Sequence, residues 1–147
     1  MPDIIDLVIH DHHEVAQLFE KLEAATAASE RSDLFARVKA ELVRHATAEE
    51  RVLYPRVKKE VPDGRHEAKD ATEEHDQIRA SLKEVEEHDP ASDLFALAVT
   101  QLVATTKHHV GVEEEELLPH FKEHSELAER EELGRRFQEE KAAIDIG

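Results

Sequence analysis

The sequence predicts an all-α protein, an up-down-up-down antiparallel four-helix bundle with a short extra C-terminal helix. Charged residues make up 37% of the 147 residues and apolar residues 39%, while four glycines and five prolines leave few breaks. This balance favours long amphipathic helices over many short strands. The length fits one compact domain, and the two halves of the chain repeat each other.

Apolar residues spaced three and four apart predict four amphipathic helices. Ser32 and Ser92 are suitable N-caps, and the pentapeptide SDLFA begins at both, so the second and fourth helices are expected to open alike. The second helix should weaken near Pro55. The four expected helices cover about residues 3–27, 32–55, 66–87 and 92–121. We therefore divide the chain into a bundle, residues 1–121, and a C-terminal helical tail packed on it, residues 122–147.

The net charge of −16 argues against nucleic acid as a partner and against anionic membrane surfaces. We find neither a stretch of about 18 apolar residues nor a signal peptide, so a cytoplasmic location and no membrane partner are expected. The absence of cysteine excludes disulfides and thiolate metal sites. A monomer is the expected oligomeric state.

Two segments carry the same potential metal ligands. HATAEERVLYP from His45 and HVGVEEEELLP from His109 each place a glutamate four residues after the histidine, at Glu49 and Glu113. Residues four apart share one helical face, and both histidines continue the apolar stripe of their helix. A buried carboxylate is costly unless it is paired or binds a cation, so the pattern indicates a metal site in the core.

Two further histidines are expected to face the core. HHEVAQLFEKL from His12 and HDQIRASLKEV from His75 match in their apolar positions. At about 1.5 Å per residue, His12 lies level with the His45 pair, whereas His75 lies about one turn from the level of His109. The HDPAS loop would have to absorb that difference. Four imidazoles and two carboxylates between four helices suit two ions of iron, zinc or copper.

The order His, HxxxE, His, HxxxE in an acidic bundle resembles the hemerythrin-like, or HHE cation-binding, family over roughly residues 3–121. The family's oxygen carriers have a second histidine on the third helix where this chain has Arg79. One histidine fewer leaves a coordination position open, so redox chemistry is expected rather than reversible oxygen carriage. The resemblance implies two iron ions per chain in an oxo- or hydroxo-bridged centre, held by His12, His45, Glu49, His75, His109 and Glu113.

Tyr54 is the only tyrosine and stands where the second half of the repeat has Leu118. Its hydroxyl is a candidate catalytic group, as an iron ligand or as a proton donor to bound peroxide. On an ideal helix Tyr54 points about 140° away from Glu49, which favours a structural role unless Pro55 distorts the helix end. Both interpretations stay open at the level of the sequence.

The main functional hypothesis is a non-haem di-iron oxidoreductase that consumes hydrogen peroxide, nitric oxide or both, in a peroxidase- or catalase-like reaction. Small oxidants are the expected partners, and no organic substrate is required. The alternative is a module that binds or senses oxygen, nitric oxide or iron without turnover, which would need a partner protein. Two sites per chain make a zinc or iron store the least favoured class.

Overall fold

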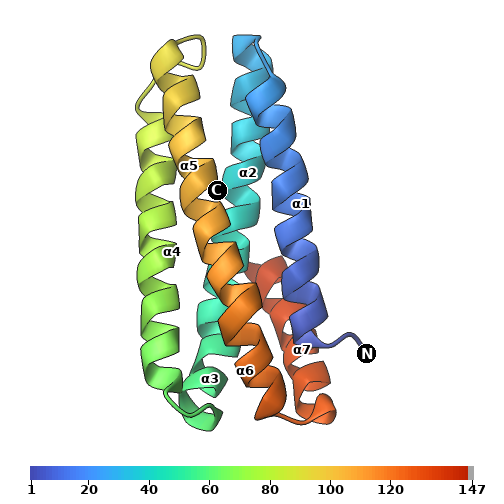
Figure 1. Cartoon of the computed structure of the whole chain (residues 1–147). Coiled ribbons are helices and arrows are strands. Elements are labelled where there is room, and N and C mark those ends of the chain that lie inside the picture. Colours follow the sequence, from blue (N-terminus) through green and yellow to red (C-terminus); the bar gives the residue numbers. More distant parts are fainter. Residues whose placement is uncertain (146–147) are drawn as a thin grey trace.

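The computed structural model describes residues 1–145, and over that range its regular structure is entirely helical. Four long helices run antiparallel to one another, and a fifth packs along one end of the bundle (Figure 1). The elements are α1 (Ile4–Ala24), α2 (Ala28–Ala48), the π-helical turn η1 (Glu49–Leu53), α3 (Tyr54–Glu60), α4 (Gly64–Glu86), α5 (Asp93–Val112), the π-helical turn η2 (Glu113–Leu117), α6 (Leu118–Glu123) and α7 (Leu127–Ala143). Because α2–η1–α3 and α5–η2–α6 are each continuous, the predicted bundle with an extra C-terminal helix is confirmed.

Side-chain caps begin two of the four long helices. Asp3 caps α1 and Ser92 caps α5, each accepting a hydrogen bond from a backbone N–H in the first turn. The prediction that Ser32 caps the second helix is wrong, because α2 begins at Ala28 and Ser32 lies inside it. Ala28, Glu30 and Arg31 are good helix formers, so the four residues before Ser32 join the helix. The repeated SDLFA therefore opens only α5.

The histidine levels differ from those expected. His12 lies 12 residues before the last residue of α1, and His45 lies 17 residues after the first residue of α2. In the second half the corresponding separations are 11 residues for His75 and 16 residues for His109. In both halves, the second histidine therefore lies five residues further from the connection between its helices than the first histidine does. The first pair had been placed level because both helix ends at its connection were predicted three or four residues too late.

Pro55 does not weaken the second helix, which continues to Glu60. The proline stands at the start of α3, directly after the π turn η1. The fourth helix likewise continues past its proline to Glu123. The second and fourth long helices are therefore each interrupted by a π turn and then resume.

A polar layer divides the hydrophobic core in two. One cluster, which we call the loop-side core, packs α1, α2, α4 and α5 near the α1–α2 and α4–α5 connections. The other, the α7-side core, joins the starts of α1 and α4 with α3, α6 and α7. Along α1 the layer falls at His12, between Val8 of one core and Val15 of the other. The predicted ligands therefore lie between two apolar blocks.

Helix α7 is docked by a close backbone approach and an ion pair. A side-chain carbon at Gly134 would come within 2.3 Å of the Pro2 carbonyl oxygen, so only glycine fits there. Arg130 donates from Nε to Asp3, the cap of α1, at 2.8 Å. Phe137 is 1% exposed and belongs to the α7-side core. These contacts hold α7 against the start of α1.

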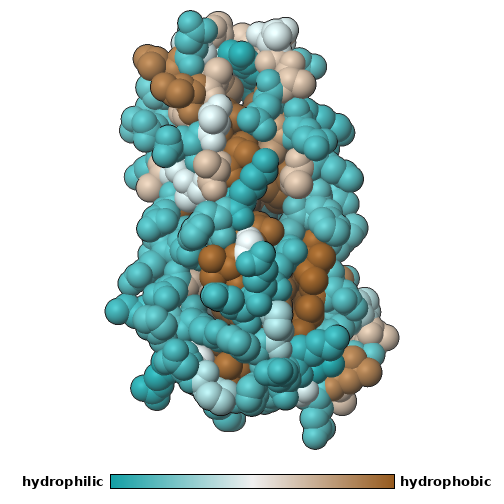
Figure 2. All heavy atoms as spheres, viewed as in Figure 1, coloured by the Kyte–Doolittle hydropathy of each residue, from teal (hydrophilic) through white to brown (hydrophobic). Residues whose placement is uncertain are grey.

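The surface agrees with the acidic composition. Figure 2 shows a mostly hydrophilic face on which hydrophobic atoms appear in short strips between helices. Within residues 1–145, no helix has the length and apolar character needed to cross a membrane.

Two glycine substitutions should have opposite effects on stability. Gly134→Ala overpacks a backbone contact, a change that costs about 1–3 kcal/mol, so it should lower the thermal midpoint. Gly111→Ala is the matched control, because nothing lies within 4 Å of its added carbon. Alanine there gains about 1 kcal/mol of helix propensity and should raise the midpoint. Thermal unfolding followed by circular dichroism tests both, and equal shifts would contradict the docking of α7.

Candidate metal centre

The two π turns position the two glutamates of the polar layer. In each, the residue before the proline donates its backbone N–H to the carbonyl five residues earlier, Tyr54 to Glu49 and Leu118 to Glu113. A proline ring clashes with the carbonyl four residues before it, and in both helices that carbonyl lies inside the π turn. We attribute the π turns to these prolines. Such turns are frequent at functional sites.

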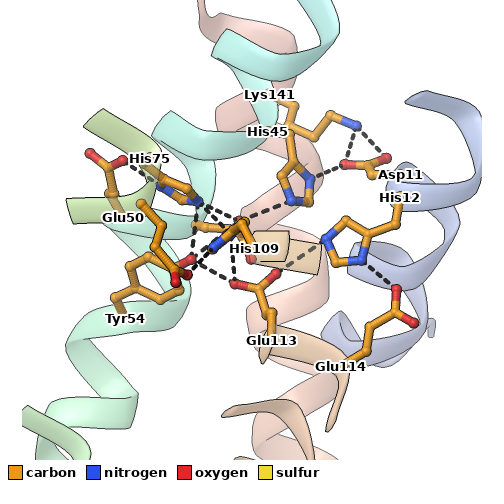
Figure 3. Close-up of polar contacts among 12 residues, drawn as sticks. Asp11, His12, His45, Glu50, Tyr54, His75, His109, Glu113, Glu114 and Lys141 are labelled. Carbon is orange, nitrogen blue, oxygen red and sulfur yellow. Dashed lines mark hydrogen bonds and ion pairs between the residues drawn. The ribbon is translucent and has the colours of Figure 1, made fainter. Parts of the chain in front are cut away.

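All six predicted ligands are buried and converge in this layer (Figure 3). Glu49 Oε1 lies 2.9 Å from His45 Nε2 and 3.2 Å from His75 Nε2. Each of these histidines belongs to a different half of the repeat, so the carboxylate lies between the halves. The structure brings together the full set, His12, His45, Glu49, His75, His109 and Glu113.

Glu113 occupies the equivalent position on the opposite side. Its Oε1 lies 3.2 Å from His12 Nε2, and its Oε2 lies 3.4 Å from His109 Nε2. The ligand atoms form two groups, each with all its atoms within 4.8 Å of one another: Glu49, His75, His109 and Glu113, and His12, His45 and Glu113. One group takes its histidines from α4 and α5, and the other takes them from α1 and α2, so each half of the repeat supplies the two histidines of one group.

Each of the four histidines uses its outer nitrogen, Nδ1, to contact a carboxylate outside the cluster. Metal-binding histidines commonly make such a contact, which fixes the tautomer and turns Nε2 towards the metal. The pairs are His12 with Glu114 at 2.6 Å, His45 with Asp11 at 2.8 Å, His75 with Glu50 at 2.6 Å and His109 with Glu74 at 2.8 Å.

These four outer carboxylates were missed by the sequence analysis, although the sequence contains a signal for them. Asp11 and Glu74 directly precede a predicted histidine, and Glu50 and Glu114 directly follow a predicted glutamate. Neighbours on a helix point about 100° apart, so each reaches a histidine on another helix. The repeat therefore extends to the residues that orient the ligands.

A further set of charges holds the outer carboxylates. Lys141 of α7 donates to both oxygens of Asp11, at 2.7 and 2.8 Å. Arg79 donates to Glu50 at 2.8 Å, and Glu50 is the carboxylate that contacts His75. Arg79 stands where the resemblance places the extra histidine of the oxygen carriers. Through Lys141, a helix outside the repeat contacts the surroundings of the cluster.

The donor set fits metal ions. Four atoms that point into the cluster are buried and make no contact with full hydrogen-bond geometry within residues 1–145: His12 Nε2, His45 Nε2, Glu49 Oε2 and Glu113 Oε1. The two imidazole nitrogens instead lie 3.2 and 2.9 Å from cluster carboxylates, close enough for a shared cation. Buried polar atoms are rarely left without a partner, and imidazole with carboxylate is a donor set suited to iron or zinc.

The neighbouring carboxylates strongly raise the pKa values of two cluster histidines, His45 and His109. Burial lowers the pKa of His45, but the charge of Glu49 and the hydrogen bond to Asp11 outweigh it and raise the pKa to about 10. For His109, hydrogen bonds to Glu113 and Glu74 likewise outweigh burial and raise the pKa to about 10. The pKa of Glu113 is held well below its usual range by His109 and His12, against the effect of burial. In the absence of metal, protons on the imidazoles balance the buried carboxylates.

Tyr54 does not point outward as it would on an ideal helix. The π turn places five residues in one turn, with the Tyr54 N–H bonded to the Glu49 carbonyl, and so brings the tyrosine towards the face of Glu49. Its hydroxyl donates to Glu113 Oε2 at 2.6 Å and lies 3.1 Å from His75 Nε2 (Figure 3). The ring stacks on His75, with 5.4 Å between centroids. Burial and the charges of Glu113 and Glu49 raise the pKa of Tyr54 well above its usual value, so the phenol stays protonated.

A small cavity of about 20 Å³ adjoins the cluster. All four cluster histidines line it, and its remaining walls are mostly apolar, with Val15, Leu42, Ile78 and Val110 among them. About 10–15 Å³ of such volume holds one water. The cavity therefore admits a molecule of very few atoms beside the imidazoles.

Comparison with known proteins agrees with this geometry. A hemerythrin HHE cation-binding domain-containing protein from Mycobacterium kansasii has a similar structure, with a TM-score of 0.85 and 21% identity, covering 97% of this chain and 90% of that one. A DNA nickase from Nostoc sp. is 27% identical over 142 residues, 97% of this chain and 40% of the relative. An uncharacterised hemerythrin-like protein from Schizosaccharomyces pombe is 25% identical over 134 residues, 90% of this chain and 65% of the relative.

The chain thus spans less than two thirds of the length of both curated relatives. Residues 3–121 match the family described as the hemerythrin HHE cation binding domain. This range contains every histidine and glutamate of the cluster and all four outer carboxylates. The chain belongs to the hemerythrin HHE cation-binding domain family.

Proposed function

We propose that the six buried ligands hold two iron ions and that the protein consumes a small oxidant, hydrogen peroxide or nitric oxide. One observation carries the proposal: the four histidines that flank the two buried carboxylates all line a cavity with room for about one small molecule. An iron pair with an open position supplies redox chemistry and Lewis acidity to such a molecule. The cavity leaves no room for an organic substrate.

The residues of the chain have separate tasks in this proposal. The outer carboxylates hold each imidazole with Nε2 turned inward, so the ligands need little reorganisation when metal binds. The apolar cavity walls limit water beside the cluster. Tyr54 keeps its proton at the hydroxyl oxygen, 2.6 Å from Glu113, and can donate it to a molecule bound beside the cluster. The hydrogen bond to Glu113 supports the role of proton donor, and the alternative role of iron ligand is distinguished by the Tyr54→Phe variant below.

The name of the Nostoc relative raises DNA cleavage as another possibility, and the site does not favour it. The apolar cavity beside the cluster, about 20 Å³, is far too small for a phosphodiester strand, and the larger pocket that reaches His109 and Glu113 is lined by six carboxylates, which repel one. The net charge of −16 also repels a phosphate backbone. We accordingly propose no nucleic-acid partner.

Metal content and turnover test the proposal directly. The chain isolated from iron-supplemented cells should contain about two irons and should consume peroxide or nitric oxide faster than the same amount of free iron. His12→Ala should lose about one iron per chain together with most of the turnover, since it removes a ligand of one group. His13→Ala is the matched control, because His13 is the exposed neighbour of His12 and lies outside the cluster. Iron that binds without any turnover would instead support the binding or sensing module.

Metal binding should release protons. At pH 7.5 both His45 and His109, with pKa values of about 10, are protonated, and a metal ion must displace those protons. We expect about two protons per loaded chain, from calorimetry in buffers of different ionisation enthalpy, and an affinity that rises up to about pH 10. These raised pKa values also stabilise the metal-free fold fully below about pH 6.5, a contribution lost as the pH rises towards 10. Binding without proton release would contradict the protonated state.

Tyr54→Phe separates the two chemical roles of the phenol. If Tyr54 is a proton donor, the variant should keep its iron and its visible spectrum while turnover of peroxide falls about 10²–10⁴-fold. A charge-transfer band present in the wild type and lost in the variant would show an iron-bound phenolate instead. Thermal unfolding of the loaded variant controls for loss of the buried hydrogen bond. Unchanged spectrum and unchanged turnover would leave Tyr54 with a structural role only.

A further inference from the structure

A second and larger pocket reaches the cluster from the side where α4 packs against η2 and α6. We call it the acidic pocket; its volume is about 270 Å³. Six of its twelve lining residues are aspartate or glutamate and three are histidine, with no lysine or arginine among those the structure places there. Its inner end is formed by His109 and Glu113 of the cluster. Metal-ligand side chains therefore line it from the surface to the proposed iron site.

We propose that the acidic pocket is the route by which a divalent cation, ferrous iron above all, reaches the metal centre, with a transient binding site at its mouth. The inference rests on the proposed function in requiring that the cluster bind metal. It adds two histidine–carboxylate pairs at the mouth, His66 with Asp70 and His120 with Glu67, that bind the ion transiently before it passes inward.

The mouth of the acidic pocket contains two pairs of an imidazole and a carboxylate. His66 Nε2 lies 3.2 Å from Asp70 one turn later on α4, and His120 Nδ1 of α6 lies 2.5 Å from Glu67 Oε1. Histidine with carboxylate suits ferrous iron and zinc. The mouth thus has the donor types of the cluster, on residues that are more exposed.

An unpartnered oxygen points to a cation on this path. Glu67 Oε2 is buried and has no hydrogen-bond partner among the described residues. At the inner end, Glu113 is 1% exposed and lines the same pocket. Glu67, Asp70 and Glu74 follow one another three and four residues apart on α4, so they share one helical face, and Glu74 holds His109. Carboxylates therefore recur at each turn of α4 from the mouth to His109.

Two other pockets near the cluster suit a cation poorly. The groove between α1, α2 and α7, of about 470 Å³, is lined by Lys21, Arg37, Arg44 and Lys141 and by none of the six proposed ligands. The apolar cavity, at about 20 Å³, is too small for an ion that keeps part of its hydration shell. Cation and oxidant would thus approach the centre from different sides.

Stopped-flow mixing can measure the route, because Tyr54 is the only tyrosine in a chain without tryptophan and lies beside the cluster. Quenching of its fluorescence should follow the arrival of anaerobic Fe²⁺ at the metal-free protein, once circular dichroism shows that protein to be helical. The test variant is E67Q/D70N, in which the amides keep the size and an acceptor oxygen. The control is E14Q/E41Q in the groove, where Glu14 pairs with His10 at 3.2 Å, as Asp70 pairs with His66.

We expect E67Q/D70N to slow association about tenfold at low salt, with a smaller effect at high salt, because pocket charges raise the local cation concentration. The iron bound at the end point should stay at the wild-type value, and E14Q/E41Q should associate at the wild-type rate. An unchanged rate in E67Q/D70N, or equal slowing in both pairs, would overturn the route. If the metal-free chain is not helical, release of iron from the loaded protein to a ferrous chelator must show the same contrast. A wild type that binds no iron would overturn the proposed function itself.

Discussion

The structure depends on the burial of two carboxylates, Glu49 and Glu113, at the centre of a hydrophobic bundle. Both are at most 1% exposed, and an isolated buried carboxylate costs several kcal/mol. Positive charge must therefore lie beside them in every folded state. In the absence of metal, protonated imidazoles supply it, and the pKa values of His45 and His109 rise to about 10 for that reason. A metal ion takes the place of those protons, so folding and metal binding share one electrostatic requirement.

The rest of the fold keeps this charged layer rigid and nearly dry. The loop-side core and the α7-side core lie on either side of it, so the ligand helices cannot separate without exposing apolar side chains. The outer carboxylates then restrain the rotation of each imidazole ring, so that Nε2 faces the cluster. Helix α7 adds to both effects, because Phe137 packs edge-on against His45 and Lys141 holds Asp11. The C-terminal helix thus contributes to the site as well as to stability.

The sequence predicted the fold and the six inward residues because periodicity and the repeat report directly which face of a helix is buried. It did not predict features that depend on the residues next to a motif, such as where a helix begins and which way a side chain points. The helix-forming residues Ala28, Glu30 and Arg31 moved the start of α2 away from Ser32, and a proline-linked π turn rotated Tyr54 into the cluster. Ideal helical geometry cannot anticipate a π turn, although the shared position of Pro55 and Pro119 was a visible signal. The partners of α7 depend on tertiary contacts that no periodicity encodes.

The repeat is symmetric in its ligands and asymmetric around them. One half places a phenol at Tyr54 where the other has Leu118, and the phenol donates to the Glu113 carboxylate. Asp11 is held by the permanent charge of Lys141, whereas its counterpart Glu74 contacts, besides His109, the exposed imidazole of His108 at 3.4 Å. Under the proposed function, these unequal surroundings would give the two metal ions different affinities and potentials. An oxidant in the cavity beside all four histidines would therefore meet two inequivalent ions, which suits stepwise electron transfer better than symmetric binding.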